Sequence, residues 1–208
     1  MTETTPSVPP VAESRRGRPG YDRAGILEVA VAAFIEFGYD ATSMGVLADR
    51  LGISKSAIYH HFASKEEMLD RALSEALDGL EGVLASEAAA TGSASDRLAA
   101  VLRGAVLVLV DRLPYVTLLL RVRGNTVVER DALTRRREFD RAVTALVRAA
   151  GDEGTLRSDV DPRVVELLLF GMVNSIVEWY RPGGEEDAER LADDVLAIAF
   201  DGLRSRAG

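Results

Sequence analysis

The residues best suited to bind a charged partner are crowded into one short stretch of this 208-residue chain. Residues 51–69, LGISKSAIYHHFASKEEML, contain both histidines and both lysines, while arginine supplies the positive charge elsewhere. Adjacent residues on a helix diverge by about 100°, and no third ligand is nearby, which argues against a metal site at the two histidines. Lysine amines close to helix starts can instead hold phosphate groups.

Catalytic chemistry has little support in the sequence. Cysteine is absent, neither a G-x-S-x-G elbow nor a glycine-rich phosphate loop occurs, and the acidic pair Glu185 and Glu186 is explained by a helix start. We therefore predict a protein that is not an enzyme and that needs no cofactor or metal. The lack of cysteine, of an apolar N-terminal segment and of a long apolar run predicts a cytoplasmic protein without a membrane span.

Hydrophobic spacing and capping residues predict a series of helices around the lysines. Apolar residues recur at three- and four-residue steps after Asp22 and stop at Gly38, which is typical of one amphipathic helix. The helices that follow, with their predicted caps, are 44–51 (Thr42 or Ser43), 55–61 (Ser54) and 65–90 (Ser64 with Glu67). In the 44–51 helix, the predicted apolar face is Val46, Leu47 and Leu51.

A short helix, a turn with Gly52 and a second short helix form the helix-turn-helix pattern, in which the second helix enters the DNA major groove. Ala57, Ile58 and Phe62 are predicted to hold that helix to its core. The residues then left outside, or at the next helix start, are predicted to contact DNA: Lys55, Ser56, Tyr59, His60 and Lys65.

The net charge of −8 does not oppose a DNA partner once its distribution is considered. Residues 1–65 carry seven basic and seven acidic residues, whereas the remainder carries 18 basic and 26 acidic residues. Polyphosphate is therefore tolerated only at the N-terminal part. Residues 1–20 are predicted to be a disordered arm. Its Arg15, Arg16 and Arg18 either lie along the duplex or only make the arm more soluble.

The string GILEVAVAAFIEFGYDATSMGVLADRLGISKSAIYHHFASKEEML resembles the N-terminal domain of the TetR family of bacterial transcriptional regulators. The resemblance implies an all-α fold, with a helix-turn-helix domain at 21–66 and a ligand-binding and dimerisation domain at 67–208. It implies a dimer that represses at a palindromic double-stranded operator until a small molecule releases it. It also adds Ser43 to the DNA contacts, together with the neighbouring capping residues Thr42 and Ser54.

The C-terminal part is predicted to contain further helices, two of them with more apolar surface than one subunit can cover. Ser95 is predicted to cap a helix through residue 111, Pro114 to start another, and 127–151 to form a long one with RRREFDR on its exposed side. The helices at 162–181 and 187–204 carry apolar residues on two sides, including Ile176 and Ile198. We therefore predict that they form a four-helix bundle with a second subunit, although a larger monomer core is the alternative.

Two segments are candidates for binding an effector. LLLRVRGNTVVER places Arg121 and Asn125 one turn apart, with Arg123 nearby, where they hold either a phosphorylated ligand or salt-bridge partners. FGMVNSIVEWYRPGG resembles TetR-type regulators of fatty-acid, steroid and phenylacetate catabolism, which implies a CoA thioester as effector. The alternative is a drug or antibiotic sensor that controls efflux. The ligand residues predicted in this second segment are Phe170, Asn174, Glu178 and Trp179.

Overall fold

The computed structural model describes residues 22–203, and within that range all regular secondary structure is helical, which confirms the predicted all-α class. The predicted arm of residues 1–20 lies outside the described residues. In chain order the helices are α1 (Arg23–Phe37), α2 (Met44–Leu51), α3 (Lys55–Tyr59), α4 (Lys65–Leu84), α5 (Glu87–Ala90), α6 (Ala94–Asp111), α7 (Leu113–Arg121), α8 (Val127–Asp152), α9 (Pro162–Trp179) and α10 (Ala188–Leu203).

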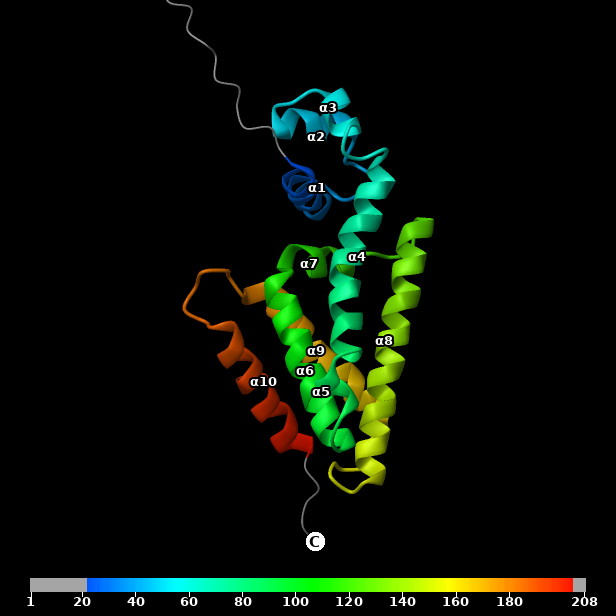
Figure 1. Ribbon diagram of the computed structural model, residues 1–208, viewed down its shortest axis with the longest axis vertical. Helices are drawn as coiled ribbons and strands as arrows, with labels where there is room; N and C mark the ends of the chain where they lie inside the picture. The colour runs from blue at the N-terminus through cyan, green and yellow to red at the C-terminus, as the bar shows by residue number, and fades with distance from the viewer. Residues whose placement is uncertain (1–21, 204–208) are drawn as a thin grey trace, which may run out of the picture.

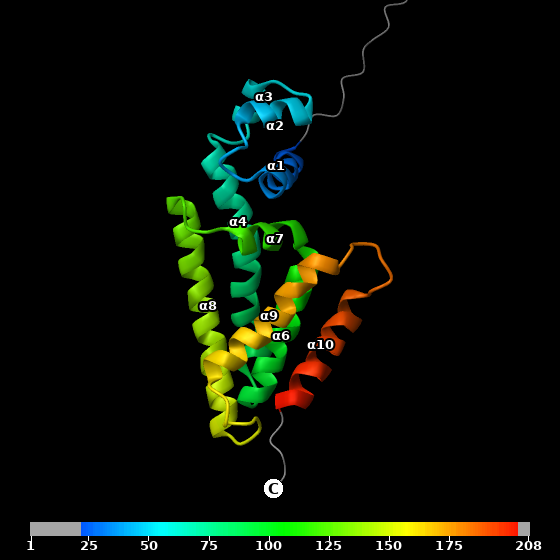
Figure 2. The same cartoon turned by 180° about the vertical axis from the view of Figure 1, so that it is seen from behind.

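The helices form an elongated molecule with α1, α2 and α3 gathered at one end (Figure 1). The fourth helix, α4, begins beside them and runs into the bundle that the later helices build. Seen from behind, α9 crosses this bundle diagonally, while α10 packs against α6 (Figure 2). Two elements therefore join the small end to the bundle: α4, which passes through both, and α7, which packs against α1.

The first four helices begin where the capping residues of the sequence predict. Asp22 accepts a hydrogen bond from the backbone N–H of Gly25 at 2.8 Å, and Ser54 accepts one from Ala57 at 3.2 Å. These side chains satisfy N–H groups that have no partner inside the helix. Gly38 ends α1 at φ 87° and Gly52 ends α2 at φ 67°, a left-handed conformation in which a side chain would be strained.

Three local predictions are wrong in detail. The helix expected to reach residue 90 breaks after Leu84, because Ser86 donates its hydroxyl to the carbonyl of Val83 and caps α5. Ser93, and not Ser95, caps α6. Val46, predicted on the inner face of α2, is exposed. The predicted end of α6 at residue 111 is confirmed.

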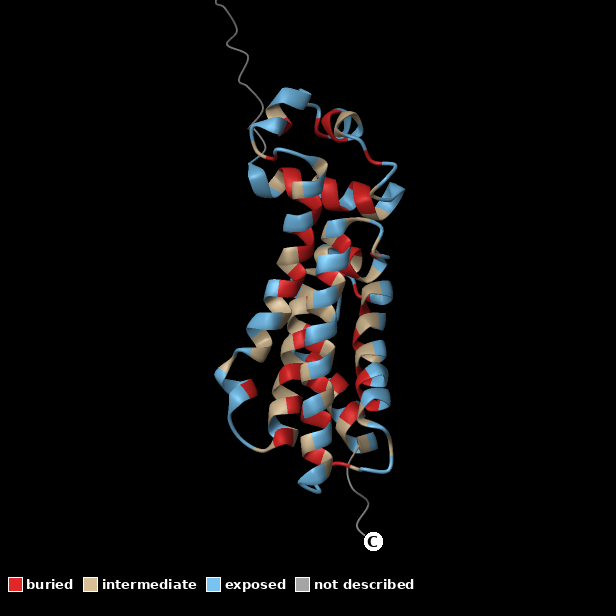
Figure 3. Cartoon of the chain, turned by 90° about the vertical axis from the view of Figure 1, so that its right-hand side faces the viewer, coloured by how far each residue is buried: buried red, intermediate tan, exposed pale blue. Residues whose placement is uncertain are grey.

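A continuous core extends from α1 to α10, and its buried residues lie along the inward faces of the helices (Figure 3). At the small end, Ile26, Ile58 and Phe62 are almost completely buried in this core, and Ile58 is the buried residue of α3. The apolar burial in the bundle is carried mainly by leucine and valine on α4, α6 and α8. This core fixes the orientation of each helix, and so decides which side chains remain outside.

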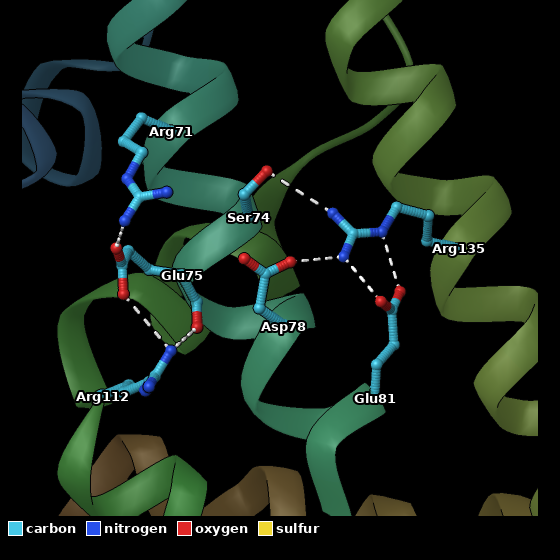
Figure 4. A network of polar contacts seen from close by, with 7 residues as sticks. All are labelled: Arg71, Ser74, Glu75, Asp78, Glu81, Arg112 and Arg135. Atoms are coloured by element: carbon cyan, nitrogen blue, oxygen red, sulfur yellow. Dashed lines mark hydrogen bonds and ion pairs between the residues drawn. The ribbon is translucent and has the colours of Figure 1, made fainter. Parts of the chain in front are cut away.

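Polar contacts fasten α4 to the bundle on two sides (Figure 4). On one side, Arg135 of α8 donates to both carboxylate oxygens of Glu81 at 2.8 Å and to Asp78 at 2.6 Å. On the other, Arg112 donates to the carbonyl and the carboxylate of Glu75. A bidentate arginine–carboxylate pair restricts orientation as well as distance, so α4 is expected to move together with α8 and with the start of α7.

Across residues 22–203, no helix combines the length and the apolar character that a membrane span needs.

Candidate DNA interface and ligand cavity

The outer face of α3 carries the side chains that were predicted to contact DNA. Lys55, Ser56, Tyr59 and His60 are all exposed, because Ile58 and the following Phe62 occupy the inward positions. The Tyr59 side chain is 51% exposed although its ring is large and apolar. An uncovered aromatic ring on the same surface as a lysine amine, a serine hydroxyl and an imidazole is suited to contacts with phosphates and base edges.

Lys55 lies over the first turn of α2, in a space that Gly45 leaves open. A Cβ atom at Gly45 would lie 3.2 Å from Cε and 3.3 Å from Nζ of Lys55, and 3.4 Å from the hydroxyl of Ser43. The ammonium group therefore lies next to the free N–H groups at the start of α2, where the helix dipole is also positive. Together the two features make an anion site, and a DNA phosphate is an anion that would fit it.

The serines at the helix starts serve the fold as well as the surface. Ser43 accepts a hydrogen bond from the N–H of Val46 at 3.2 Å, and the hydroxyls of Ser54 and Ser56 lie 3.0 Å apart. All three are exposed. A hydroxyl that accepts from its own helix can still donate to a phosphate oxygen, so capping does not remove these residues from the predicted interface.

Two of the predicted DNA contacts point inward. Thr42 is completely buried, and its hydroxyl donates to the carbonyl of Gly38 at 2.8 Å, so the prediction that this side chain touches DNA is wrong. The ammonium of Lys65 donates to the carbonyl of Tyr39 at 2.7 Å and lies 4.1 Å from the centre of the Tyr39 ring. Lys65 therefore ties the start of α4 to the loop after α1, and its contact with DNA stays a prediction.

A partly open cavity of about 270 Å³, which we call the central cavity, lies between α4, α6, α7, α8 and α9. Its walls are mostly apolar, with four polar or charged exceptions. The apolar lining comprises Leu80, Ala105, Leu109, Val116, Leu119, Leu120, Phe139, Leu167, Phe170, Gly171 and Val173, and the polar lining comprises Arg136, Asp140, Glu166 and Asn174. An apolar chamber with a few convergent polar groups is the usual form of a small-molecule site.

A second hollow of about 310 Å³ adjoins the central cavity and shares Asp140, Glu166 and Leu167 with it. We call it the arginine mouth, because Arg137, Arg141 and Arg163 line it. Within the described residues none of these three forms an ion pair closer than 4.0 Å, unlike Arg135 on the same helix. Three cations thus line a hollow that adjoins an apolar chamber.

The effector residues predicted from sequence do not form one site. Arg121, Arg123 and Asn125 line a different hollow of about 410 Å³, between α1 and the α7–α8 loop. Arg121 there donates to the carbonyl of Ile35 in α1 at 2.8 Å. The prediction that Arg121 and Asn125 lie one helical turn apart is wrong, because α7 ends at Arg121 and the loop beyond it is held by Glu129, which accepts from three consecutive N–H groups.

The second predicted segment is divided between the cavity and the surface. Phe170 and Asn174 line the central cavity, and the ring of Phe170 packs edge-on against Phe139 at 5.3 Å. Glu178 and Trp179 are exposed at the end of α9, and Trp179 is 48% exposed. Their assignment to the ligand is therefore not supported by their position.

The prediction from sequence missed the charged residues of the cavity and its mouth. The segment RRREFDR was expected on the exposed side of α8, yet Phe139 is buried and Arg136 and Asp140 line the central cavity. One signal was available: a phenylalanine at the centre of a charged run indicates that one face of the run is covered. Gly45 was also missed, although a glycine inside a short helix commonly marks a close approach.

The small helical unit, with its exposed second short helix and its anion site at α2, places the chain in the class of helix-turn-helix DNA-binding proteins. Residues 26–72 match the family model described as bacterial regulatory proteins, tetR family. Residues 91–203 match the one described as tetracyclin repressor-like, C-terminal domain. The chain belongs to the TetR family, and it is a DNA-binding transcriptional regulator.

Named relatives agree with this assignment. The HTH-type transcriptional repressor KstR2 of Rhodococcus jostii is 33% identical over 216 residues, which cover 95% of this chain and 98% of the relative. The crystal structure of SCO3833, a TetR-family member from Streptomyces coelicolor A3, is 55% identical with a TM-score of 0.81, covering 86% of this chain and 91% of that one. AibR, solved with isovaleryl coenzyme A and operator DNA, is 27% identical with a TM-score of 0.69, covering 86% and 97%.

Proposed function

We propose that this protein is a dimeric transcriptional repressor that leaves its operator when an acyl- or aryl-CoA thioester enters the central cavity. The observation that carries the proposal is the union of an apolar chamber with the arginine mouth. A chamber of about 270 Å³ is too small for a whole CoA thioester, so only the acyl or aryl part would enter. The phosphorylated part would remain at the mouth.

The mouth supplies the chemistry that phosphates require. Arginine presents a planar fork of donors that matches phosphate oxygens, and it stays charged at every physiological pH. Arg137 and Arg141 are one turn apart on α8, and Arg163 faces them from the start of α9. Support also comes from AibR, a structural neighbour solved with a CoA thioester, and from the predicted likeness to regulators of catabolism.

A cationic drug is the alternative effector, and one observation favours it: the carboxylates of Asp140 and Glu166 border the cavity. Burial raises the pKa of both carboxyls, and the charges of Arg136 and Arg163 oppose that shift only in part. The central cavity and the arginine mouth are together lined by four arginines and two carboxyl groups, so their charge favours an anionic ligand, and the CoA thioester is the better match.

The dimer is proposed from the apolar surface that one subunit leaves uncovered. Val164, Leu167, Leu168 and Trp179 on α9 and Ile198 on α10 are large hydrophobic side chains with 45–68% of their surface exposed. Two consecutive helices with such a surface are typical of a bundle shared by two subunits. Ile176, one of the apolar residues from which the shared bundle was predicted, does not belong to this surface, because its side chain is buried within its own subunit.

The test is a titration of the operator complex, followed by fluorescence anisotropy of labelled DNA. Phenylacetyl-CoA and a series of straight-chain acyl-CoA thioesters are expected to lower operator affinity, while the corresponding free acids, which lack phosphates, have little effect. An effector can release DNA only if it binds the DNA-incompetent form more tightly, so operator and effector must weaken each other by the same factor. Release by planar cationic drugs alone would support the efflux alternative.

A further inference from the structure

The wall of the central cavity contains one deeply buried acidic side chain. Glu166 of α9 is only 4% exposed, and it borders both the central cavity and the arginine mouth. Asp140 of α8 borders the same two hollows. Both carboxyl groups therefore lie at the point where a ligand would pass from the mouth into the apolar chamber.

Neither carboxylate has a hydrogen-bond donor within residues 22–203 as the structure describes them. Burial raises the pKa of the Glu166 carboxyl, and the charge of Asp140 raises it further, while Arg163 and Arg136 act in the opposite direction. Burial likewise raises the pKa of Asp140. No fully buried side-chain oxygen in the described part of the chain lacks a partner, so the carboxylate oxygens of this pair reach the space of the hollows, where water can hydrate them. A ligand that displaced this water would leave the carboxylates desolvated and without a donor, which is costly.

The missing partner is a hydrogen-bonding group and not a charge. Arg136 and Arg163 already supply positive charge beside the two acidic groups, although burial has the larger effect on both pKa values. A hydroxyl group is the partner that fits every protonation state of this pair, because it donates to a carboxylate and accepts from a carboxylic acid. A plain methylene at the same place would leave the carboxylate desolvated and unpaired.

We propose that Glu166, assisted by Asp140, makes the repressor selective for effectors whose acyl or aryl part carries a hydroxyl group. This inference rests on the proposed function, since it names the ligand class that the central cavity prefers. A hydrogen bond to a charged group, together with the cost of leaving that group unpaired, corresponds to a preference of roughly 10- to 100-fold over the ligand without the hydroxyl.

The test is isothermal titration calorimetry of the full-length protein with matched pairs of thioesters. One set compares phenylacetyl-CoA with its 2-, 3- and 4-hydroxyphenyl derivatives. The other compares octanoyl-CoA with 8-hydroxyoctanoyl-CoA. At least one hydroxylated ligand of a pair should bind about tenfold or more tightly than its parent. Glu166→Leu should abolish this preference and improve binding of the parent, whereas Glu166→Gln, which keeps the shape and a donor and an acceptor, should retain part of it.

Glu178→Gln, on the same helix but exposed, is the matched control and should keep the wild-type preference. Equal binding of parent and hydroxylated ligands by the wild type, or an unchanged preference in Glu166→Leu, overturns the inference and leaves the CoA assignment in place. If no thioester binds a protein that still binds DNA, both the hydroxyl preference and the proposed response to CoA thioesters are overturned.

Discussion

Replacement of Gly45 by alanine should weaken DNA binding without weakening the fold. The added Cβ would lie 3.2 Å from Cε and 3.3 Å from Nζ of Lys55, closer than ordinary van der Waals contact. Because the crowded atoms are at the end of a flexible side chain, the lysine can move by a few tenths of an ångström or more at little cost to folding. Alanine also favours a helix over glycine, by at most ~1 kcal/mol, so stability should stay the same or rise.

The loss of DNA affinity caused by Gly45→Ala should be compared with the loss caused by Lys55→Ala, which removes the lysine amine. Lys55→Ala is expected to reduce the slope of log affinity against log salt by about 0.9 for each subunit that contacts B-DNA, and to weaken operator and unrelated DNA alike. Gly45→Ala moves the same amine away from the start of α2 without removing it, so its slope should fall between those of the wild type and Lys55→Ala.

The assay is fluorescence anisotropy of labelled DNA over a series of salt concentrations, with thermal unfolding of each variant measured in parallel. The variant that carries both Gly45→Ala and Lys55→Ala provides the decisive comparison. In it, the alanine at position 45 cannot act by displacing Lys55, because the lysine is absent. If Gly45→Ala costs as much affinity in the Lys55→Ala background as in the wild type, Lys55 is not the residue that it displaces, and the anion site at α2 is wrong.

Two further predictions concern assembly and pH. Leu168→Asp or Ile198→Asp should convert the protein to a monomer in sedimentation at micromolar concentration, since each places an unpaired charge on the apolar surface of α9 or α10. Val127→Asp, at an exposed position on α8, is the control and should leave the dimer intact. A wild-type protein that sediments as a monomer would contradict the dimer. Burial raises the pKa of the Glu166 carboxyl above its ordinary value of about 4.5. Between these two pKa values the carboxyl is protonated in the folded protein and ionised in the unfolded chain. The free energy of unfolding therefore falls as the pH rises from the unfolded to the folded pKa. Glu166→Gln should therefore raise the free energy of unfolding more at pH 7.5 than at pH 4, and an equal effect at both would refute this explanation.

The helices of the DNA-binding end could be predicted because their signals are local. Asp22, Ser43 and Ser54 cap the helices that the sequence assigns to them, and Gly38 and Gly52 end two of them. The outward face of α3 followed from the same reasoning, since Ile58 must point to the core. Thr42 was misplaced because a threonine before a helix can cap it or point inward, and only the packing of α1 decides between the two.

The ligand cavity could not be predicted in the same way. Its walls come from five helices, and their crossing angles determine which of several apolar faces meet around a hollow. Arg121 and Arg136 look equivalent in sequence, as arginines close to apolar residues. The fold turns Arg121 toward the carbonyl of Ile35 in α1, while Arg136 reaches the central cavity.

The most direct test of the account is the response of the operator complex to a CoA thioester when the arginine mouth is altered. Arg137 and Arg141 are changed together to alanine, and Arg148→Ala, an exposed arginine farther along α8, is the control. Titration of each complex with the thioester that releases the wild type, followed by anisotropy, gives the effector concentration at half release. The account predicts at least a tenfold rise for the double variant, unchanged operator affinity without effector, and a wild-type response for the control. Release of the double variant at the wild-type concentration would contradict it.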